Sequence, residues 1–234
     1  MEPTVSLTST VALVTGASSG IGQATARRLA AEGATVVPVA RRQDRIKVLA
    51  KEIVGHDGRA VASTADLTDA DAAGVMFTGD SARAPLREWE QMVDINVKGL
   101  LYVTKAALPH LSEAAATSPR QVADVVNVSS IAGRFAVPAG AVYNATKFGV
   151  TAATEAWRQE YARRNVRFSV VEPGLTETEL FGHQQQAVQE RMAARFADVE
   201  KLRADDVAET VEYVVTSPRR RAVAEIVIRP TDQV

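Results

Sequence analysis

The stretch Thr15-Gly16-Ala17-Ser18-Ser19-Gly20-Ile21-Gly22 decides the fold. It follows an apolar run at 11–14, which predicts a buried strand, and precedes residues 23–32, in which alanines and Leu29 share one face of a predicted helix. Glycines between strand and helix allow a tight turn and a close approach of the backbone to a pyrophosphate. A helix start also offers free N–H groups to phosphate. This pattern predicts a dinucleotide site, with an unliganded tight turn as the alternative.

Working outward from this turn, strand-like and helix-like segments alternate along the chain. We predict further strands at 35–39, 59–65, 122–128, 166–172 and 225–228, and helices at 45–54, 89–110, 144–164 and 204–216. Residues 112–124 are predicted to form an exposed loop. Such alternation favours a parallel sheet with helices on both faces. We therefore expect an α/β protein, a single Rossmann-type doubly wound domain over residues 1–234.

Composition excludes several classes of function. The formal net charge is −1, which gives no electrostatic case for binding nucleic acid or an anionic membrane. The chain has no cysteine, so disulfides and thiolate chemistry are excluded. We find neither a signal peptide at residues 1–10 nor an apolar run of membrane-spanning length. We expect a cytoplasmic protein.

The end of the second predicted strand indicates which cofactor the turn binds. An NAD site usually places an acidic residue there to hold the ribose 2′-hydroxyl. This chain instead has Arg41 and Arg42, and guanidinium groups suit a 2′-phosphate. Ser18 can add a hydroxyl. We predict NADP(H) with Arg41 as the principal contact, the alternative being that the arginines are merely solvated.

Further motifs resemble those of the short-chain dehydrogenase/reductase family over nearly the whole chain. Besides the glycine turn, they are Asp66-Leu67, Asn96, Ser130, Tyr143 with Lys147, and Pro173-Gly174. The resemblance implies a hydride transfer to or from a carbonyl carbon. It also implies a homotetramer or homodimer formed through the two long helices.

The resemblance assigns catalytic roles to Ser130, Tyr143, Lys147 and Asn96. Tyr143 and Lys147 are four residues apart at a predicted helix start, so both side chains leave one face. A neighbouring ammonium, with the cationic nicotinamide, would lower the phenol pKa and make Tyr143 an effective proton donor or acceptor. Ser130 would hydrogen-bond the carbonyl oxygen. In the family, the asparagine matching Asn96 supports a proton-relay water near the lysine.

The cofactor-binding residues predicted from the turn, the arginines and the resemblance form a longer set. They are Gly16, Ser18, Ser19, Gly20, Ile21, Gly22, Arg41, Arg42, Asp66, Leu67, Tyr143, Lys147, Pro173, Gly174, Thr176 and Thr178. The resemblance places Pro173 and Gly174 beside the nicotinamide. Residues 180–197 match the variable lid over the substrate.

One departure from the family lies between Ala72 and Ala73. Family members carry a helix and a strand there, some 20-odd residues that end in an Asn-Asn-Ala-Gly motif. In the strand order 3-2-1-4-5-6 that strand is central. Without it, two strands would stand roughly 10 Å apart, about twice the normal spacing, with unpaired backbone groups. We expect the natural polypeptide to carry the segment, a true deletion being the alternative.

The expected activity is NADPH-dependent reduction of an aldehyde or ketone to an alcohol, in a reversible reaction. The resemblance extends to a small, polar, bicyclic substrate of the clavulanate-9-aldehyde type. The alternative is a catalytically silent Rossmann protein that binds a nucleotide or a partner. A sugar-nucleotide epimerase or dehydratase is disfavoured by the short chain and by the GxxxGxG spacing. The three histidines lack metal-ligand spacing, so no metal is expected.

Overall fold

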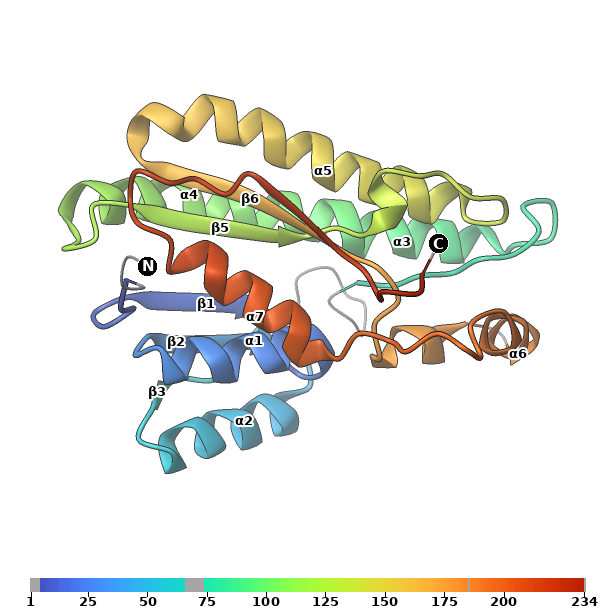
Figure 1. Cartoon of the computed structure of the whole chain (residues 1–234), viewed down its shortest axis with the longest axis horizontal. Helices are drawn as coiled ribbons and strands as arrows, with labels where there is room; N and C mark the ends of the chain where they lie inside the picture. Colours follow the sequence, from blue (N-terminus) through green and yellow to red (C-terminus); the bar gives the residue numbers. More distant parts are fainter. Residues whose placement is uncertain (1–4, 66–73, 185, 234) are drawn as a thin grey trace.

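The computed structural model describes residues 5–65, 74–184 and 186–233. Its first half is a parallel sheet in which β2 lies between β1 and the short strands β3 and β4 (Figure 1). The elements are β1 (Val11–Thr15), α1 (Gly20–Ala31), β2 (Thr35–Ala40), α2 (Gln43–Gly55), β3 (Arg59–Ala60) and β4 (Ser63–Thr64). The strand predicted at 59–65 is thus two short pieces, both paired with β2.

The second half is another parallel sheet, in the order β5-β6-β7. Its elements are α3 (Leu86–Val93), a π-helical turn (Asp94–Gly99), α4 (Leu100–Thr117), β5 (Ala123–Val128), α5 (Ala141–Tyr161), β6 (Val166–Pro173), α6 (Gln186–Arg195), α7 (Ala204–Val215) and β7 (Glu225–Ile228). In Figure 1, α3, α4 and α5 lie beside β5 and β6, away from α1 and α2. Parallel strands flanked by helices confirm the predicted α/β class.

The loop predicted at 112–124 was wrong over its first half. Helix α4 continues to Thr117, because the alanine-rich run 114–116 has high helix propensity and Ala115 packs against Phe168 and Val166 in the core. The chain leaves the helix only at Ser118, whose backbone is extended. No helix among the described residues is long and apolar enough to cross a membrane.

One hydrophobic core joins the two sheets along a single face. Val14 of β1 and Val214 of α7 belong to the same buried cluster, and Val126 of β5 packs against it. Helix α7 contacts α1 in the first half and both β5 and β6 in the second. In Figure 1 it lies across the junction between the halves. Side-chain packing under α7 therefore fixes the relative position of the two sheets.

The side chains on the other face of β1 are exposed. Val11 is 69% exposed and Leu13 53%, although β1 is the strand that leads into the glycine turn. Because crossovers between parallel strands are right-handed, the direction in which the chain moves along the sheet decides which face the connecting helix covers. Helices α1 and α2 connect strands that lead away from β1. A helix that leads back from β3 toward the centre of the sheet would therefore lie on the other face and cover these side chains. Neither such a helix nor a strand between β1 and β5 occurs among the described residues. This is the arrangement that a missing central strand would produce.

Candidate active site

The turn between β1 and α1 has the geometry of a phosphate site. A Cβ at Gly22 would lie 2.4 Å from the carbonyl oxygen of Gly16, so only glycine allows the helix this close to the strand. Gly20 has a φ of +53° and faces Thr178, which a Cβ at Gly20 would meet at 3.3 Å. No side chain caps α1, and its first turn holds no acidic residue. These residues fit the pyrophosphate of a dinucleotide, with Thr178 next to it.

Arg42 is the guanidinium that lies over this turn. It donates to Ser18 Oγ at 2.9 Å, to Ser19 Oγ at 3.0 Å and to Glu179 at 3.0 Å. Sequence reasoning favoured Arg41 as the principal contact, whereas the structure brings Arg42 to Ser18. Both arginines remain candidates for holding a 2′-phosphate.

Glu179 is a participant that the sequence did not reveal. Its carboxylate pairs with Arg45 at 2.8 Å as well as with Arg42. Hydrogen bonds from Arg45 and then Arg42 lower the pKa of Glu179 to about 2. The residue lies in the short helix Glu179–His183, at the start of the expected lid. An anion from the lid therefore occupies the guanidinium groups beside the nucleotide turn.

The three residues predicted to be catalytic, Ser130, Tyr143 and Lys147, come together from two parts of the chain. Ser130 follows β5, and Tyr143 and Lys147 lie on the first turns of α5. The Ser130 hydroxyl lies close enough to the phenol of Tyr143 to lower its pKa. Lys147 Nζ lies 5.9 Å from the centre of the Tyr143 ring and donates to the carbonyl oxygen of Val128 at 3.1 Å. The predicted spacing of Tyr143 and Lys147 thus places both groups on one side of α5.

Burial sets the protonation of this pair. It raises the pKa of Tyr143 to about 12, against a smaller lowering by the hydrogen bond from Ser130. It also lowers the pKa of Lys147 to about 8. We expected the ammonium to lower the phenol pKa, but in the chain alone burial raises it, and the opposing effect comes from Ser130. Any lowering must therefore come from groups that bind.

The depressed pKa of Lys147 predicts a rise of stability with pH. Between pH 8 and 10 the folded chain holds Lys147 neutral, whereas the unfolded chain, with a lysine pKa near 10.4, binds the proton. The unfolded state binds more protons, so the free energy of unfolding increases with pH, by about 2–3 kcal/mol over this window. From about pH 10 the raised pKa of Tyr143 reverses the trend.

Urea unfolding at pH 8, 9 and 10 measures this effect, with Lys147→Met as the comparison. The rise should be absent from the Met variant. An equal rise in both proteins would assign it to other groups.

Asn96 lies in the π-helical turn and hydrogen-bonds the backbone of a neighbouring segment. Its side chain accepts from the N–H of Val75 at 3.0 Å and donates to the Val75 carbonyl at 2.9 Å. It also donates to Thr146 Oγ1 at 3.2 Å. A π-turn in a helix frequently marks a functional site. Asn96 thus links residue 75 to α5 one residue from Lys147, and its role toward a relay water stays a prediction.

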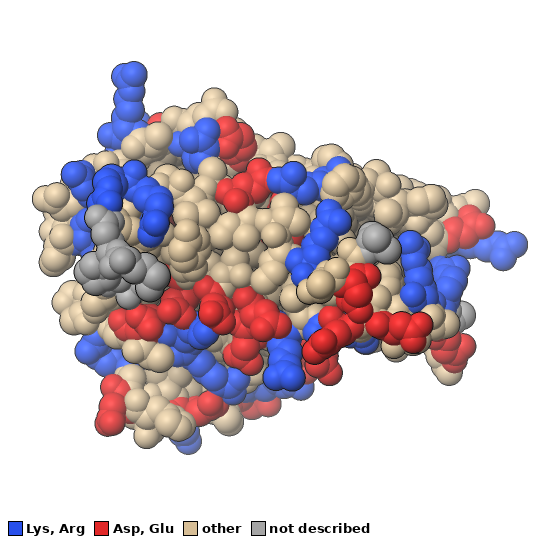
Figure 2. All heavy atoms as spheres, in the orientation of Figure 1, with Lys and Arg blue, Asp and Glu red and all other residues tan. Residues whose placement is uncertain are grey.

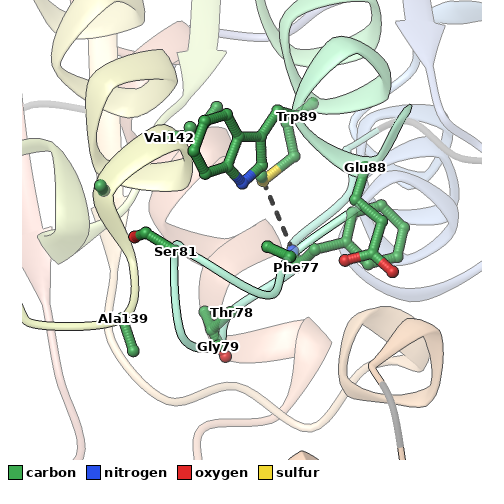
Figure 3. A pocket seen from close by; sticks show the side chains of 11 residues that line it. Phe77, Thr78, Gly79, Ser81, Glu88, Trp89, Ala139 and Val142 are labelled. Atoms are coloured by element: carbon green, nitrogen blue, oxygen red, sulfur yellow. Dashed lines mark hydrogen bonds between the residues drawn. The ribbon is translucent and has the colours of Figure 1, made fainter. Parts of the chain in front are cut away.

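Apolar side chains enclose Tyr143. Its buried cluster contains Val75, Met76, Met92 and Ile95, and Leu180 and Met192 from the lid region pack against it. Next to it, Phe77, Trp89, Ala139 and Val142 line a small hollow, in which the N–H of Phe77 points at the sulfur of Met92 (Figure 3). Gln184 of the lid accepts from the N–H of Thr78 at 2.9 Å. Leu180, Gln184 and Met192 of the lid region therefore pack against the cluster around Tyr143 and the segment beside it.

The remaining predicted residues follow β6. The Pro173 carbonyl lies 3.5 Å from Ser130 Oγ, and Thr176 donates to the Gly174 carbonyl at 3.0 Å. A Cβ at Gly174 would collide with Gln233 of the C-terminal tail, so the tail packs directly on this backbone. Asp66 and Leu67 lie outside the described residues.

Comparison with known proteins identifies the family. The model of the short chain dehydrogenases matches residues 10–73 and 70–189. The chain belongs to the short-chain dehydrogenase family. An uncharacterized oxidoreductase of Mycobacterium tuberculosis is 40% identical over 245 residues, covering 95% of this chain and 92% of its own. Dehydrogenase/reductase SDR family member 11 of Gallus gallus is 34% identical over 256 residues, covering 97% and 98%.

Solved structures agree with this assignment. A serine dehydrogenase in complex with NADP+ superposes with a TM-score of 0.84 at 27% identity, covering 96% of both chains. A 3-ketoacyl-(acyl-carrier-protein) reductase of Brucella melitensis in complex with NADH gives 0.79 at 27% identity, covering 95% and 97%. As a short-chain dehydrogenase, the protein is an NAD(P)-dependent oxidoreductase that acts on a CH–OH group or the corresponding carbonyl.

Proposed function

We propose that this short-chain dehydrogenase reduces an aldehyde or ketone to an alcohol with NADPH, by a reversible reaction. The observation that carries the proposal is that Ser130, Tyr143 and Lys147 meet at the start of α5, with Lys147 Nζ 5.9 Å from the centre of the phenol ring and the Ser130 hydroxyl close enough to lower the pKa of Tyr143. The test is NADPH consumption with a panel of aldehydes and ketones, in which turnover must depend on Tyr143.

The bound cofactor supplies the hydride that the carbonyl carbon receives. Tyr143 gives its hydroxyl proton to the carbonyl oxygen, so that the product is the neutral alcohol. Ser130 hydrogen-bonds the same oxygen and stabilises the charge that develops on it. Lys147 faces the Tyr143 ring, where an ammonium favours the phenolate that remains. Asn96 is proposed to support the return of a proton to this pair through a relay water.

Arg42 and Ser18 support NADPH over NADH. Their side chains lie 2.9 Å apart beside the turn, where a 2′-phosphate would find a guanidinium and a hydroxyl. Arg41 follows β2 and adds a second cation. The similar structures include complexes with both NADP and NADH, so the arginines carry this part of the proposal.

Glu179→Gln is expected to tighten NADPH binding about two- to fivefold and to leave NADH binding unchanged. The carboxylate of Glu179 competes with a 2′-phosphate for Arg42 and Arg45, and NADH has no such phosphate. Fluorescence titration with each cofactor measures the effect. Glu177→Gln, an exposed carboxylate on the same segment, is the matched control. An equal gain for NADH would show that Glu179 acts on something other than the 2′-phosphate.

The substrate is proposed to be a small, polar carbonyl compound. Within the family, the chain resembles clavulanic acid dehydrogenase in Ser129-Ser130-Ile131-Ala132-Gly133-Arg134, in residues 145–150 and in the tail 228–234. The relatives named above carry other names, so we propose clavulanate-9-aldehyde only as a type of substrate.

Assembly and location are proposed on the same basis. Leu101 and Tyr102 of α4 and Phe148 of α5 are exposed apolar side chains, which suits a homodimer or homotetramer formed through these helices. Acidic and basic groups are mixed over the face in Figure 2, as in a protein without a nucleic-acid or membrane partner. A cytoplasmic location stays a prediction.

We also propose that the natural polypeptide, folded as one domain, carries a helix and a strand between Ala72 and Ala73. The alignments with the two relatives, at 245 and 256 residues, are longer than the 234-residue chain, so the chain lacks residues that they have. The two ranges of the family model meet at 70–73. The bare face of β1 lies where the segment would pack. If the deletion is genuine, a silent nucleotide- or partner-binding protein becomes the better proposal.

A further inference from the structure

Glu172 is a fully buried carboxylate close to the catalytic groups. It precedes Pro173 at the end of β6 and has no exposed surface. Arg134 forms a charged hydrogen bond with its Oε2 and also pairs with Glu225. The hydroxyl of Thr151, on α5, lies 3.0 Å from its Oε1. A buried charge is costly without such partners, so this set of contacts is under strong structural constraint.

The hydroxyl groups next to Glu172 extend the contacts to the catalytic helix. Thr151 has one hydrogen, and an ionised carboxylate only accepts, so this hydrogen goes to Glu172. Ser129 Oγ lies 3.0 Å from Thr151 Oγ1 and donates to the carbonyl oxygen of Lys147 at 3.0 Å. Because both hydrogens are used in this way, the Thr151 and Ser129 oxygens touch without a hydrogen between them, and Glu172 is the group that links Arg134 to Thr151 of α5.

The backbone that carries Ser130 is pressed against the same atoms. A Cβ at Gly133 would lie 2.7 Å from Ser129 Oγ, 2.9 Å from Thr151 Oγ1 and 3.0 Å from the Lys147 carbonyl oxygen. Asn144 donates to the carbonyls of Ala132 and Phe135 at 2.8 and 3.0 Å. The Ser130 loop, residues 129–134, is thus attached at both ends to α5, which carries Tyr143 and Lys147.

Ser130 itself is oriented by this attachment. Its oxygen accepts from the N–H of Ala132 at 3.1 Å, and its hydroxyl makes a long contact of 3.5 Å with the Pro173 carbonyl oxygen, which a substrate oxygen would replace as acceptor. A misplacement of about 1 Å at a reacting centre is enough to cost about 100-fold in rate. The position of the loop on α5 therefore bears directly on the proton step.

We propose that Arg134, Glu172 and Thr151 form a clamp that holds the Ser130 loop on α5, and that they are positioning residues for the reaction. The inference rests on the proposed function, because it concerns the alignment of Ser130 with Tyr143. None of the three touches the substrate, and they act through Ser130.

Thr151→Val removes the hydroxyl that joins Glu172 to α5 and keeps the volume of the side chain. We expect kcat to fall about tenfold, with the Kd of NADPH changed less than about twofold. Thr151→Ser, which keeps the hydroxyl, should restore kcat. Thr154→Val is the matched control: Thr154 is a buried hydroxyl one turn along α5, bonded to Asn127 and not to the loop. It should retain wild-type kcat.

A double-mutant cycle separates positioning from a general loss of stability. Glu172→Gln keeps the shape but forces an amide N–H toward either Arg134 or Thr151, and should lower kcat at least tenfold. In a Ser130→Ala background, both Glu172→Gln and Thr151→Val should have little further effect on kcat, because the group they position is gone.

The clamp proposal would be overturned if Glu172→Gln or Thr151→Val lowered kcat by the same factor in the Ser130→Ala background as in the wild type. It would also be overturned if Thr154→Val lowered kcat as much as Thr151→Val. If the wild type is active and the Thr151 and Glu172 variants have the same kcat, the clamp proposal is overturned and the proposed reductase activity stands. A wild type that binds NADPH but turns over no carbonyl compound would overturn both proposals. If Glu172→Gln does not fold, the comparison of Val and Ser at position 151 decides the question.

Discussion

Tyr143→Phe is expected to lower kcat about 10²–10⁴-fold while the Kd of NADPH stays within about twofold of wild type. The substitution removes one oxygen and keeps the ring, which packs among Val75, Met76, Met92 and Ile95. Fold and cofactor site should therefore be preserved. The proton that the carbonyl oxygen needs would then have to come from water in an apolar enclosure.

Single-turnover and steady-state reduction of one responsive aldehyde measure the effect, with cofactor titration on the same samples. Tyr161→Phe is the control, because Tyr161 packs against Phe168 at the far end of α5 and is remote from the reaction. Loss of NADPH binding with turnover preserved would remove Tyr143 from the catalytic role.

The second large effect is expected between Ala72 and Ala73. Grafting the aligned segment of the Mycobacterium tuberculosis relative into this position should raise Tm by about 10 °C or more. The inserted strand would pair the open edges of β1 and β5, and its helix would cover Val11 and Leu13. NADPH binding should tighten as well, because the glycine turn leaves the strand that the insertion stabilises.

Two measurements check this prediction. The protein from its natural source should have an intact mass well above 25.0 kDa. The 234-residue chain and the grafted chain should differ in calorimetric Tm and in NADPH affinity, with a Gly/Ser insert of equal length as the control for chain length alone. A natural mass of 25.0 kDa, with neither NADPH nor NADH bound, would favour the silent partner-binding protein.

Local patterns predicted most of the helices and strands, and they pointed to Ser130, Tyr143 and Lys147, which the structure brings close together. The 3.6-residue period and the glycines located α1 and α2. The four-residue spacing of Tyr143 and Lys147 places both side chains on one side of α5. Contacts between segments that are distant in the chain could not be predicted from the sequence. Glu179 meets Arg42 across 137 residues, and nothing near either residue indicates the other. Glu172 lies within a strand whose residues are all buried, and nothing in the sequence near it indicates the partner of its carboxylate. Such pairs depend on tertiary packing.

The separation of the two sheets has a consequence for the dynamics of the chain. Among the described residues no ladder of backbone hydrogen bonds connects β1 with β5, so the halves are coupled mainly through α7. Regions joined only by side-chain packing can open as separate cooperative units. Amide hydrogen exchange should then fall into two classes, with faster exchange at the open edge of β1 and slow exchange in β6, whose residues are all buried between two neighbouring strands.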